Sequence, residues 1–312
     1  MTIDENIQQF AGLPIQQFSP GATTCVLQNV AVRLEVDWDA HDSGASFESI
    51  FSELVADPKC ADITALVIGD WAGAAEGNDS EPVVEALVSA RDKLPHLRAI
   101  FLGEMTVEEC EISWIQQSDV SPLFEAFPHL EELCIRGGTD LSLGRPRHAR
   151  LRKLVIETGG MSGNVVREVA SADLPALQHL ELWLGDDGYG NDVSAEDISE
   201  LLSKGPVGQL RYLGLRDDCR ADDTARLLVE HGIPASLEIL DLSLGTLGDQ
   251  GANSLAAAPW LPSLKKLDIH HHYLSFAALE RLQGVVTELD AAGVQEPDED
   301  DGESYRYVAV SE

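Results

Sequence analysis

Basic residues are scarce in this chain of 312 residues, in which 21 lysines and arginines stand against 54 aspartates and glutamates. The net charge of -33 repels phosphate backbones and anionic membrane surfaces, which argues against direct nucleic-acid or membrane binding. Such a field favours solubility and rapid encounter with a basic protein partner. Solubility alone would also account for the acidity, so the charge leaves both interpretations open.

The chain also lacks long apolar runs and paired cysteines. No window reaches the roughly 20 apolar residues that cross a bilayer, and the opening MTIDENIQQF resembles no secretion signal. We therefore expect a cytoplasmic protein. The odd number of cysteines and the absence of a C-x-x-C pair argue against a disulfide framework and a structural zinc site. We expect thiols at positions 25, 60, 110, 134 and 219.

Catalytic and nucleotide-binding motifs are missing as well. The sequence contains no GxSxG, no GxxxxGK[ST], no GxGxxG after a strand pattern and no HExxH. It also has no separate block long enough for an appended enzyme domain. The sequence therefore predicts a protein that is not an enzyme and that needs no cofactor and no metal.

What the chain does contain is a repeated apolar pattern, L-x-x-L-x-L, whose copies start 21 to 34 residues apart. The copies are ITALVI from Ile63, LRAIFL from Leu97, LEELCI from Leu130, LRKLVI from Leu151, LQHLEL from Leu177, LRYLGL from Leu210, LEILDL from Leu237 and LKKLDI from Leu264, and a degenerate copy, VTELDA, starts at Val286. This spacing is typical of leucine-rich repeats. A helical segment with its own start signal follows several copies, such as SAEDISELL with a capping-box pattern at Ser194 and Asp197.

The stretch LEILDLSLGTLGDQGANSLAAAPWLPSLKKLDIHHHYLS resembles the ribonuclease-inhibitor-like class of leucine-rich repeats, and the resemblance covers roughly residues 61–293. The motifs EISWI, RGG, LWLGDDGYG and HHYLS resemble those of an acidic bacterial leucine-rich-repeat family. The resemblance implies an α/β fold, a curved horseshoe with a parallel inner sheet and helices on the convex side, used mainly to bind proteins. The chain departs from the repeat where asparagine is usual in the turn: it has Trp71, Met105, Gly138, Gly159, Gly185, Asp218, Gly245 and His272.

These patterns predict four parts. Residues 1–60 form an N-terminal cap, because VAVRLEVDW alternates like a strand and FESIFSELVAD has helical spacing. Residues 61–293 form a solenoid of about eight repeats and a degenerate last unit. Residues 294–303 are an acidic, mobile linker, and residues 304–312 are a final strand on the cap or the sheet edge.

Because side chains alternate along a strand, the pattern also predicts the residues of the concave face. The early repeats expose apolar side chains such as Val67, Phe101 and Val155, which either bind a partner or lie under the cap or an insert. The later repeats expose acids, arginine and tryptophan, a composition typical of protein-binding hot spots. We predict partner contacts at Phe101, Arg136, Glu157, Glu181, Trp183, Arg216, Asp241, Asp268 and His270.

The three consecutive histidines 270–272 raise the question of a metal site. Strand alternation places Leu267 and Ile269 inside and His270 on the concave face, whereas His272 takes the asparagine position in the turn. The three rings therefore do not converge on one ion. A metal or small-ligand site near Asp241, Asp268 and His270 is the alternative to a recognition surface.

Two long turns border the predicted face, residues 103–120 with Trp114 and residues 185–194 with Tyr189. Loops on a rigid scaffold often carry function, so these turns are a second candidate interface. The second turn is acidic like a calcium loop, but its spacing does not match the EF-hand pattern.

Overall fold

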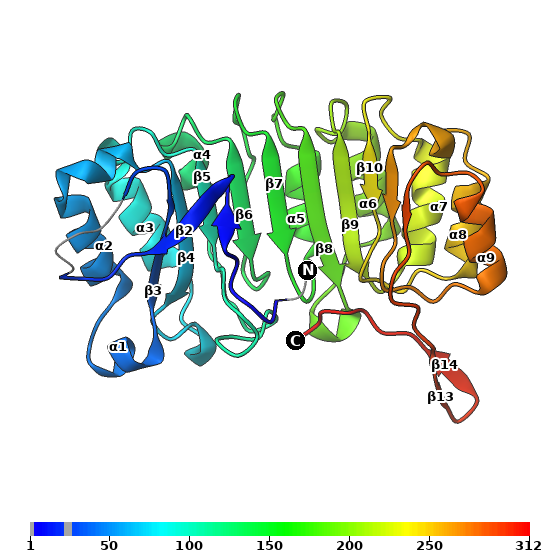
Figure 1. The fold of residues 1–312 in the computed structure, drawn as a ribbon, viewed down its shortest axis with the longest axis horizontal. Helices are drawn as coiled ribbons and strands as arrows, with labels where there is room; N and C mark the ends of the chain where they lie inside the picture. The colour runs from blue at the N-terminus through cyan, green and yellow to red at the C-terminus, as the bar shows by residue number, and fades with distance from the viewer. Residues whose placement is uncertain (1–2, 22–26) are drawn as a thin grey trace. The chain divides into compact units, whose positions relative to one another are not determined.

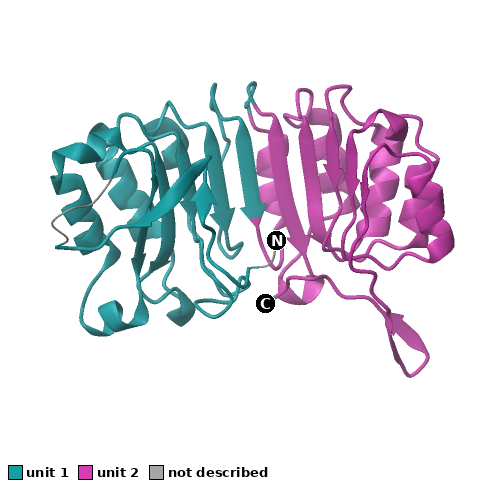
Figure 2. Cartoon of the chain, viewed as in Figure 1, with its two compact units in different colours: residues 1–156, 173–176, 312 teal, residues 157–172, 177–311 magenta. Residues whose placement is uncertain are grey.

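A computed structural model describes residues 3–21 and 27–312. Two compact units are present (Figure 2): unit 1 comprises Met1–Ile156, Asp173–Ala176 and Glu312, and unit 2 comprises Glu157–Ala172 and Leu177–Ser311. Within the described residues, none of the helices has both the length and the apolar character needed to cross a membrane. The cysteines at 60, 110, 134 and 219 are thiols, and Cys25 lies outside the described residues.

Unit 1 carries its strands in chain order, from β1 to β7, with helices behind them (Figure 1), and the last residue of β7, Glu157, is assigned to unit 2. Apart from β1 and β2, which pair antiparallel, neighbouring strands from β2 to β6 are parallel. The strands are β1 (Gln9–Phe10), β2 (Leu13–Gln17), β3 (Ala31–Val36), β4 (Ala65–Trp71), β5 (Ala99–Leu102), β6 (Glu132–Arg136) and β7 (Lys153–Glu157). The helices are α1 (Trp38–Asp42), α2 (Phe47–Ala56), α3 (Glu81–Ser89) and α4 (Pro122–Ala126), with short 3-10 turns η1 (Pro58–Asp62), η2 (Ala74–Glu76) and η3 (Arg91–Lys93).

Unit 2 repeats the same strand–turn–helix plan, and its strands β8 to β12 are parallel and again in chain order. The strands are β8 (His179–Gly185), β9 (Tyr212–Asp218), β10 (Ile239–Asp241), β11 (Lys266–Asp268) and β12 (Leu289–Asp290). The helices are α5 (Gly163–Ala170), α6 (Ala195–Lys204), α7 (Ala221–His231), α8 (Asp249–Ala256) and α9 (Phe276–Gln283), with 3-10 turns η4 (Asp187–Tyr189) and η5 (Leu261–Ser263). A separate antiparallel hairpin joins β13 (Asp298–Asp300) and β14 (Glu303–Tyr305).

The leucines of the repeat form the core of each unit. Leu180, Leu213, Leu240 and Leu267 occupy one register position across four neighbouring strands, and all four are fully buried. Burying a leucine contributes roughly 1.5–3 kcal/mol relative to exposure, so this one row is a large stabilising term. Each predicted copy of the pattern becomes a strand, and the leucine-rich-repeat fold is confirmed.

Helix starts also follow the sequence signals. Ser194 accepts a hydrogen bond from the Asp197 backbone N–H, while the Asp197 carboxylate accepts from Ser194, so the predicted capping box is formed. Ser46 and Ser49 make the same reciprocal arrangement at α2. Proline stands in the first turn of α3 and α4, where no intrahelical N–H bond is lost.

His272 replaces the usual asparagine in its turn. The ring is fully buried, its Nδ1 accepts from the Leu274 N–H at 3.0 Å, and its Nε2 lies 3.2 Å from the Ala291 carbonyl oxygen. These two contacts satisfy backbone groups of neighbouring turns, which is the task that asparagine performs in regular repeats. His272 therefore stands in the turn where the sequence pattern placed it, and its buried ring is unavailable to a ligand on the sheet.

The N-terminal residues add one strand–helix pair, β3 and α2, in register with the repeats. The β1–β2 hairpin then folds over the helix-free side of the sheet in unit 1 (Figure 1), where Phe10 contacts Phe101 with ring centroids 5.8 Å apart. Buried Arg33 and Glu104 form an ion pair beneath it, and Glu104 also accepts from the Ile7 N–H at 3.0 Å. This segment therefore covers apolar positions of unit 1.

The C-terminal residues differ from the expected linker and docked strand. Residues 298–305 form the β13–β14 hairpin, whose strand residues are all exposed. The Asp301–Gly302 turn explains this pairing, because both residues adopt the positive φ angles that close a tight hairpin. Residues 306–312 follow without forming a strand.

Candidate functional site

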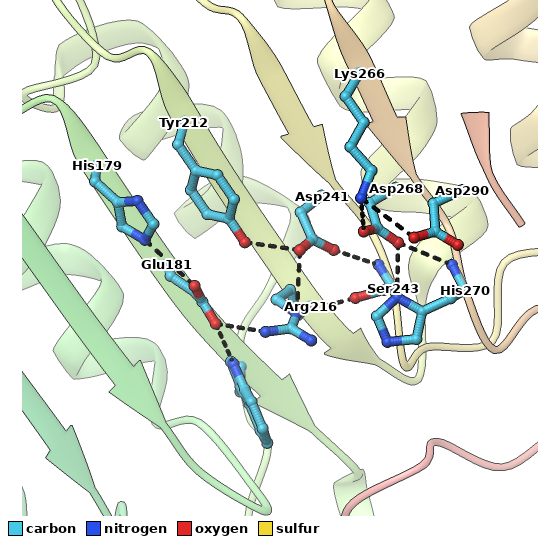
Figure 3. A network of polar contacts seen from close by, with 11 residues as sticks. His179, Glu181, Tyr212, Arg216, Asp241, Ser243, Lys266, Asp268, His270 and Asp290 are labelled. Atoms are coloured by element: carbon cyan, nitrogen blue, oxygen red, sulfur yellow. Dashed lines mark hydrogen bonds and ion pairs between the residues drawn. The ribbon is translucent and has the colours of Figure 1, made fainter. Parts of the chain in front are cut away.

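The open face of unit 2 consists of the side-chain positions of β8–β12 that point away from α5–α9. On this face a polar network runs across five strands, β8 to β12 (Figure 3). Its members are His179, Glu181, Tyr212, Arg216, Asp241, Ser243, Lys266, Asp268, His270 and Asp290. Strand alternation explains their common side, since the intervening leucines fill the core.

Arg216 on β9 is the centre of the network. Its Nη1 donates to Glu181 Oε1 at 2.6 Å, and its Nε donates to Ser243 Oγ at 2.9 Å and lies 3.4 Å from Asp241 Oδ2. The guanidinium also lies over the Trp183 ring, 5.0 Å from its centroid, and the indole N–H donates to Glu181. Burial opposes ionisation of Arg216, but the two carboxylates outweigh it and raise its pKa, so the guanidinium stays charged.

Two aromatic side chains form a second set of contacts to the carboxylates of Glu181 and Asp241. His179 and Tyr212 stack in parallel with centroids 3.9 Å apart. The His179 Nε2 lies 3.3 Å from Glu181 Oε2, and the Tyr212 hydroxyl donates to Asp241 Oδ2 at 2.7 Å. Burial raises the pKa of Glu181, yet the His179 contact and the Arg216 charge prevail and lower it to about 2. Glycine at position 214 leaves room for these contacts, because a Cβ there would lie 3.1 Å from both Glu181 and Tyr212.

Lys266 binds the carboxylates at the β11–β12 end of the network. Its ammonium donates to Asp268 Oδ2 at 2.9 Å and to Asp290 Oδ2 at 3.2 Å, while His270 Nδ1 lies 2.6 Å from Asp268 Oδ1. Asp241, Asp268 and Asp290 occupy one register position on three successive strands, as the repeat alignment predicts. Burial raises the pKa of Asp268, but the hydrogen bonds from His270 and Lys266 outweigh it and hold the pKa below its usual range.

These contacts argue against the metal alternative. Asp268, His270 and Asp290 are near enough to hold an ion, with ligand atoms within 4.8 Å of one another. However, the Lys266 ammonium already bonds to both carboxylates, and a cation would have to displace it against like-charge repulsion. Asp241 is engaged separately by Tyr212 and Arg216. The lysine thus supplies the positive charge that a metal would bring.

Of the other predicted contact residues, Phe101 and Arg136 belong to unit 1, and Glu157 is the last residue of β7. Phe101 is 4% exposed within an apolar cluster that includes Phe10, Val67 and Val155. A partner could reach that patch only by displacing the β1–β2 hairpin. Arg136 is buried beside Phe101, with its guanidinium 5.4 Å from the ring centroid and a bond to a backbone carbonyl. Glu157, at the end of β7, is also buried.

Unit 2 brings together the predicted residues Glu181, Trp183, Arg216, Asp241, Asp268 and His270. Trp183 is only 2% exposed, so it supports Arg216 rather than presenting a free surface. His179 and Tyr212 were not among the predicted contacts. They occupy the third position of L-x-x-L-x-L, which faces the same side, so the repeat alone could have identified them.

The long turns show different features. Trp114 is 56% exposed, and Tyr189 is 38% exposed. In the second turn Asp186 accepts from the Gly188 N–H, Asp192 accepts from the Gly163 N–H, and Asp187 pairs with Arg220. The acids of this turn are thus occupied by protein donors, as expected of a structural loop rather than a calcium site.

Comparisons with known proteins agree with this geometry. No protein-family model and no curated protein matches the chain. A solved structure from Bacteroides fragilis is 28% identical, covers 91% of this chain and 78% of its own, and superimposes with a TM-score of 0.79. The leucine-rich repeat-containing protein LegL7 from Legionella pneumophila is 15% identical over 88% of this chain and 89% of its own, at a TM-score of 0.49. An internalin from Listeria monocytogenes is 14% identical over 85% of this chain and 68% of its own, at a TM-score of 0.40.

The two more distant likenesses are too weak to carry an argument. The assignment depends instead on the repeat itself: one leucine register across parallel strands, a helix after nearly every strand, and side-chain bonds in the turns. The chain has the leucine-rich-repeat fold.

Proposed function

We propose that this chain is a non-catalytic cytoplasmic scaffold that binds a protein partner on the open face of unit 2. The observation that carries the proposal is the polar network, in which charged side chains from neighbouring strands hold one another in place. Fixed side chains lose little conformational entropy when a partner binds, so a preorganised surface binds more tightly than a mobile one.

The exposure that remains on this face supports a choice of contact residues. The side chains of His179, Lys266 and His270 are 25–26% exposed, and that of Asp290 is 40% exposed. Beneath them, Arg216 and Asp241 are each 8% exposed and act as support. A partner would therefore contact these exposed side chains first. The buried ion pairs beneath them would fix the orientation in which the partner binds.

The charge of the face indicates the character of the partner. Glu181, Asp241, Asp268 and Asp290 outnumber the two permanent cations, Arg216 and Lys266. This excess matches the chain's net charge of -33 and favours a basic protein surface over nucleic acid or an anionic membrane.

Site-specific photo-crosslinking tests this proposal. A photoreactive amino acid at His270 or His179 should capture a defined protein in the native host, because these side chains lie at the rim of the open face. The matched control is the same amino acid at Arg226, an exposed residue on α7 of the same unit. Equal capture from Arg226, or capture from Trp114 and not from His270, would place the interface elsewhere.

A further inference from the structure

Residues 306–310, the C-terminal segment, lie along the turns that follow β9, β10 and β11. These residues continue from the exposed β13–β14 hairpin, which is drawn in red in Figure 1. The segment contacts Asp217, Asp222, Leu244, Gly248 and Tyr273, and the surface made of these residues is called the groove. It lies at the ends of the strands and shares no residue with the polar network.

One end of the groove is an arginine site. Arg306 Nη1 donates to Asp222 Oδ2 and to the Thr246 carbonyl oxygen, each at 3.2 Å, and the guanidinium lies 5.6 Å from the Tyr273 ring centroid. A Cβ at Gly248 would lie 2.1 Å from Arg306 Nη1. A side chain at this position would force the guanidinium to move from where it lies. Charge, aromatic face and space thus combine to select arginine.

The rest of the groove binds the backbone of the segment. The Tyr273 hydroxyl donates to the Tyr307 carbonyl at 2.9 Å and accepts from the Tyr307 N–H at 2.8 Å. Further along, the Ala309 N–H donates to the Leu244 carbonyl at 2.8 Å, and the Val310 N–H donates to Asp217 Oδ1 at 3.0 Å. The Val310 side chain is 7% exposed. The groove therefore accommodates an arginine side chain and, four residues later in the same segment, a small aliphatic side chain.

The C-terminal segment leaves one polar atom of the groove unmatched. Asp217 is fully buried, and its Oδ2 has no partner among the described residues. Burial raises the pKa of Asp217 well above its usual value, because the Val310 N–H and the Arg216 charge only partly offset it. An unpaired buried oxygen is unfavourable, so a ligand that also donates to Oδ2 would bind better than the segment does.

We propose that this groove is a peptide-binding site, occupied in the isolated chain by its own C-terminal segment and open in exchange to an arginine-containing peptide of a protein partner. The exposed hairpin makes exchange feasible, since all six residues of β13 and β14 are exposed and moving them uncovers no core. The acidic surface of the chain favours a ligand with arginine.

A peptide-binding experiment with the full chain tests the proposal. Arg306→Glu together with Val310→Asp should open the groove, and the probe is a fluorescent peptide of residues 304–312, SYRYVAVSE. By anisotropy, the peptide should bind the opened chain at least about tenfold more tightly than wild type, because the tethered segment competes at high effective concentration. Adding Gly248→Ala should weaken binding by about threefold or more, since the guanidinium would have to move away from the new Cβ.

A peptide carrying the same two substitutions is the control and should not bind. Equal binding by wild type and the opened chain, or binding that ignores Gly248→Ala, would overturn the proposal. If the opened chain does not fold, wild type provides a second readout. A large excess of the native peptide should then speed amide exchange at Ala309 and Val310, and unchanged exchange would also refute the site.

Discussion

Replacing Leu240 with aspartate is expected to remove soluble, folded protein. Leu240 is fully buried in β10, in register with Leu213 and Leu267. A carboxylate there has no partner, and burying it costs several kcal/mol on top of the lost leucine packing. That sum is comparable with the roughly 5–15 kcal/mol stability of an ordinary domain. Soluble yield and the urea midpoint measure the effect.

The neighbouring residue supplies a matched control. Ile239 lies on the same strand but on the open face, where it is partly exposed. The change Ile239→Asp should cost much less, because the new carboxylate stays in contact with water. If the two variants were equally unstable, or if Leu240→Asp were tolerated, the repeat register would be wrong.

Substitution of Arg216 by methionine is expected to have the second largest effect. It leaves Glu181 and Asp241 buried without the cation that pairs with both of them. Breaking a buried ion pair from one side costs roughly 3–5 kcal/mol, and the loss should appear as a lower urea midpoint of unfolding.

A triple variant separates charge from packing. Adding Glu181→Gln and Asp241→Asn to Arg216→Met removes the uncompensated charges and should recover most of the lost stability, since neutral replacements of a buried charge cluster are often tolerated. If the triple variant were as unstable as Arg216→Met, the guanidinium would stabilise the sheet by packing on Trp183 rather than by pairing.

The sequence predicts the repeat core well, because the information is local. Each L-x-x-L-x-L copy places leucines at positions that only a strand with this register can bury, and Leu180, Leu213, Leu240 and Leu267 follow it. Ser194 and Asp197 likewise form a cap within four residues of chain. The side of the sheet on which Asp241, Asp268 and His270 lie follows from strand alternation alone.

Contacts between distant segments could not be predicted in this way. Phe10 covers Phe101 across 91 residues of sequence, and no periodicity indicates that the β1–β2 hairpin folds over the sheet. The C-terminal segment is similar, since Val310 bonds to Asp217 from 93 residues away. For the polar network, strand alternation predicts on which face of the sheet the side chains lie. The approach of Arg216 to Glu181 depends in addition on side-chain rotamers and on the space that Gly214 leaves.

Hydroxyl-radical footprinting with the partner captured at His270 tests the central claim most directly. His179, Tyr212 and His270 carry reactive rings on the open face, whereas Tyr189 and Phe276 are exposed elsewhere in unit 2. Adding the partner should lower the oxidation of the first three side chains and leave the other two unchanged. Protection confined to Tyr189, Phe276 or the residues of unit 1 would contradict a recognition surface on β8–β12.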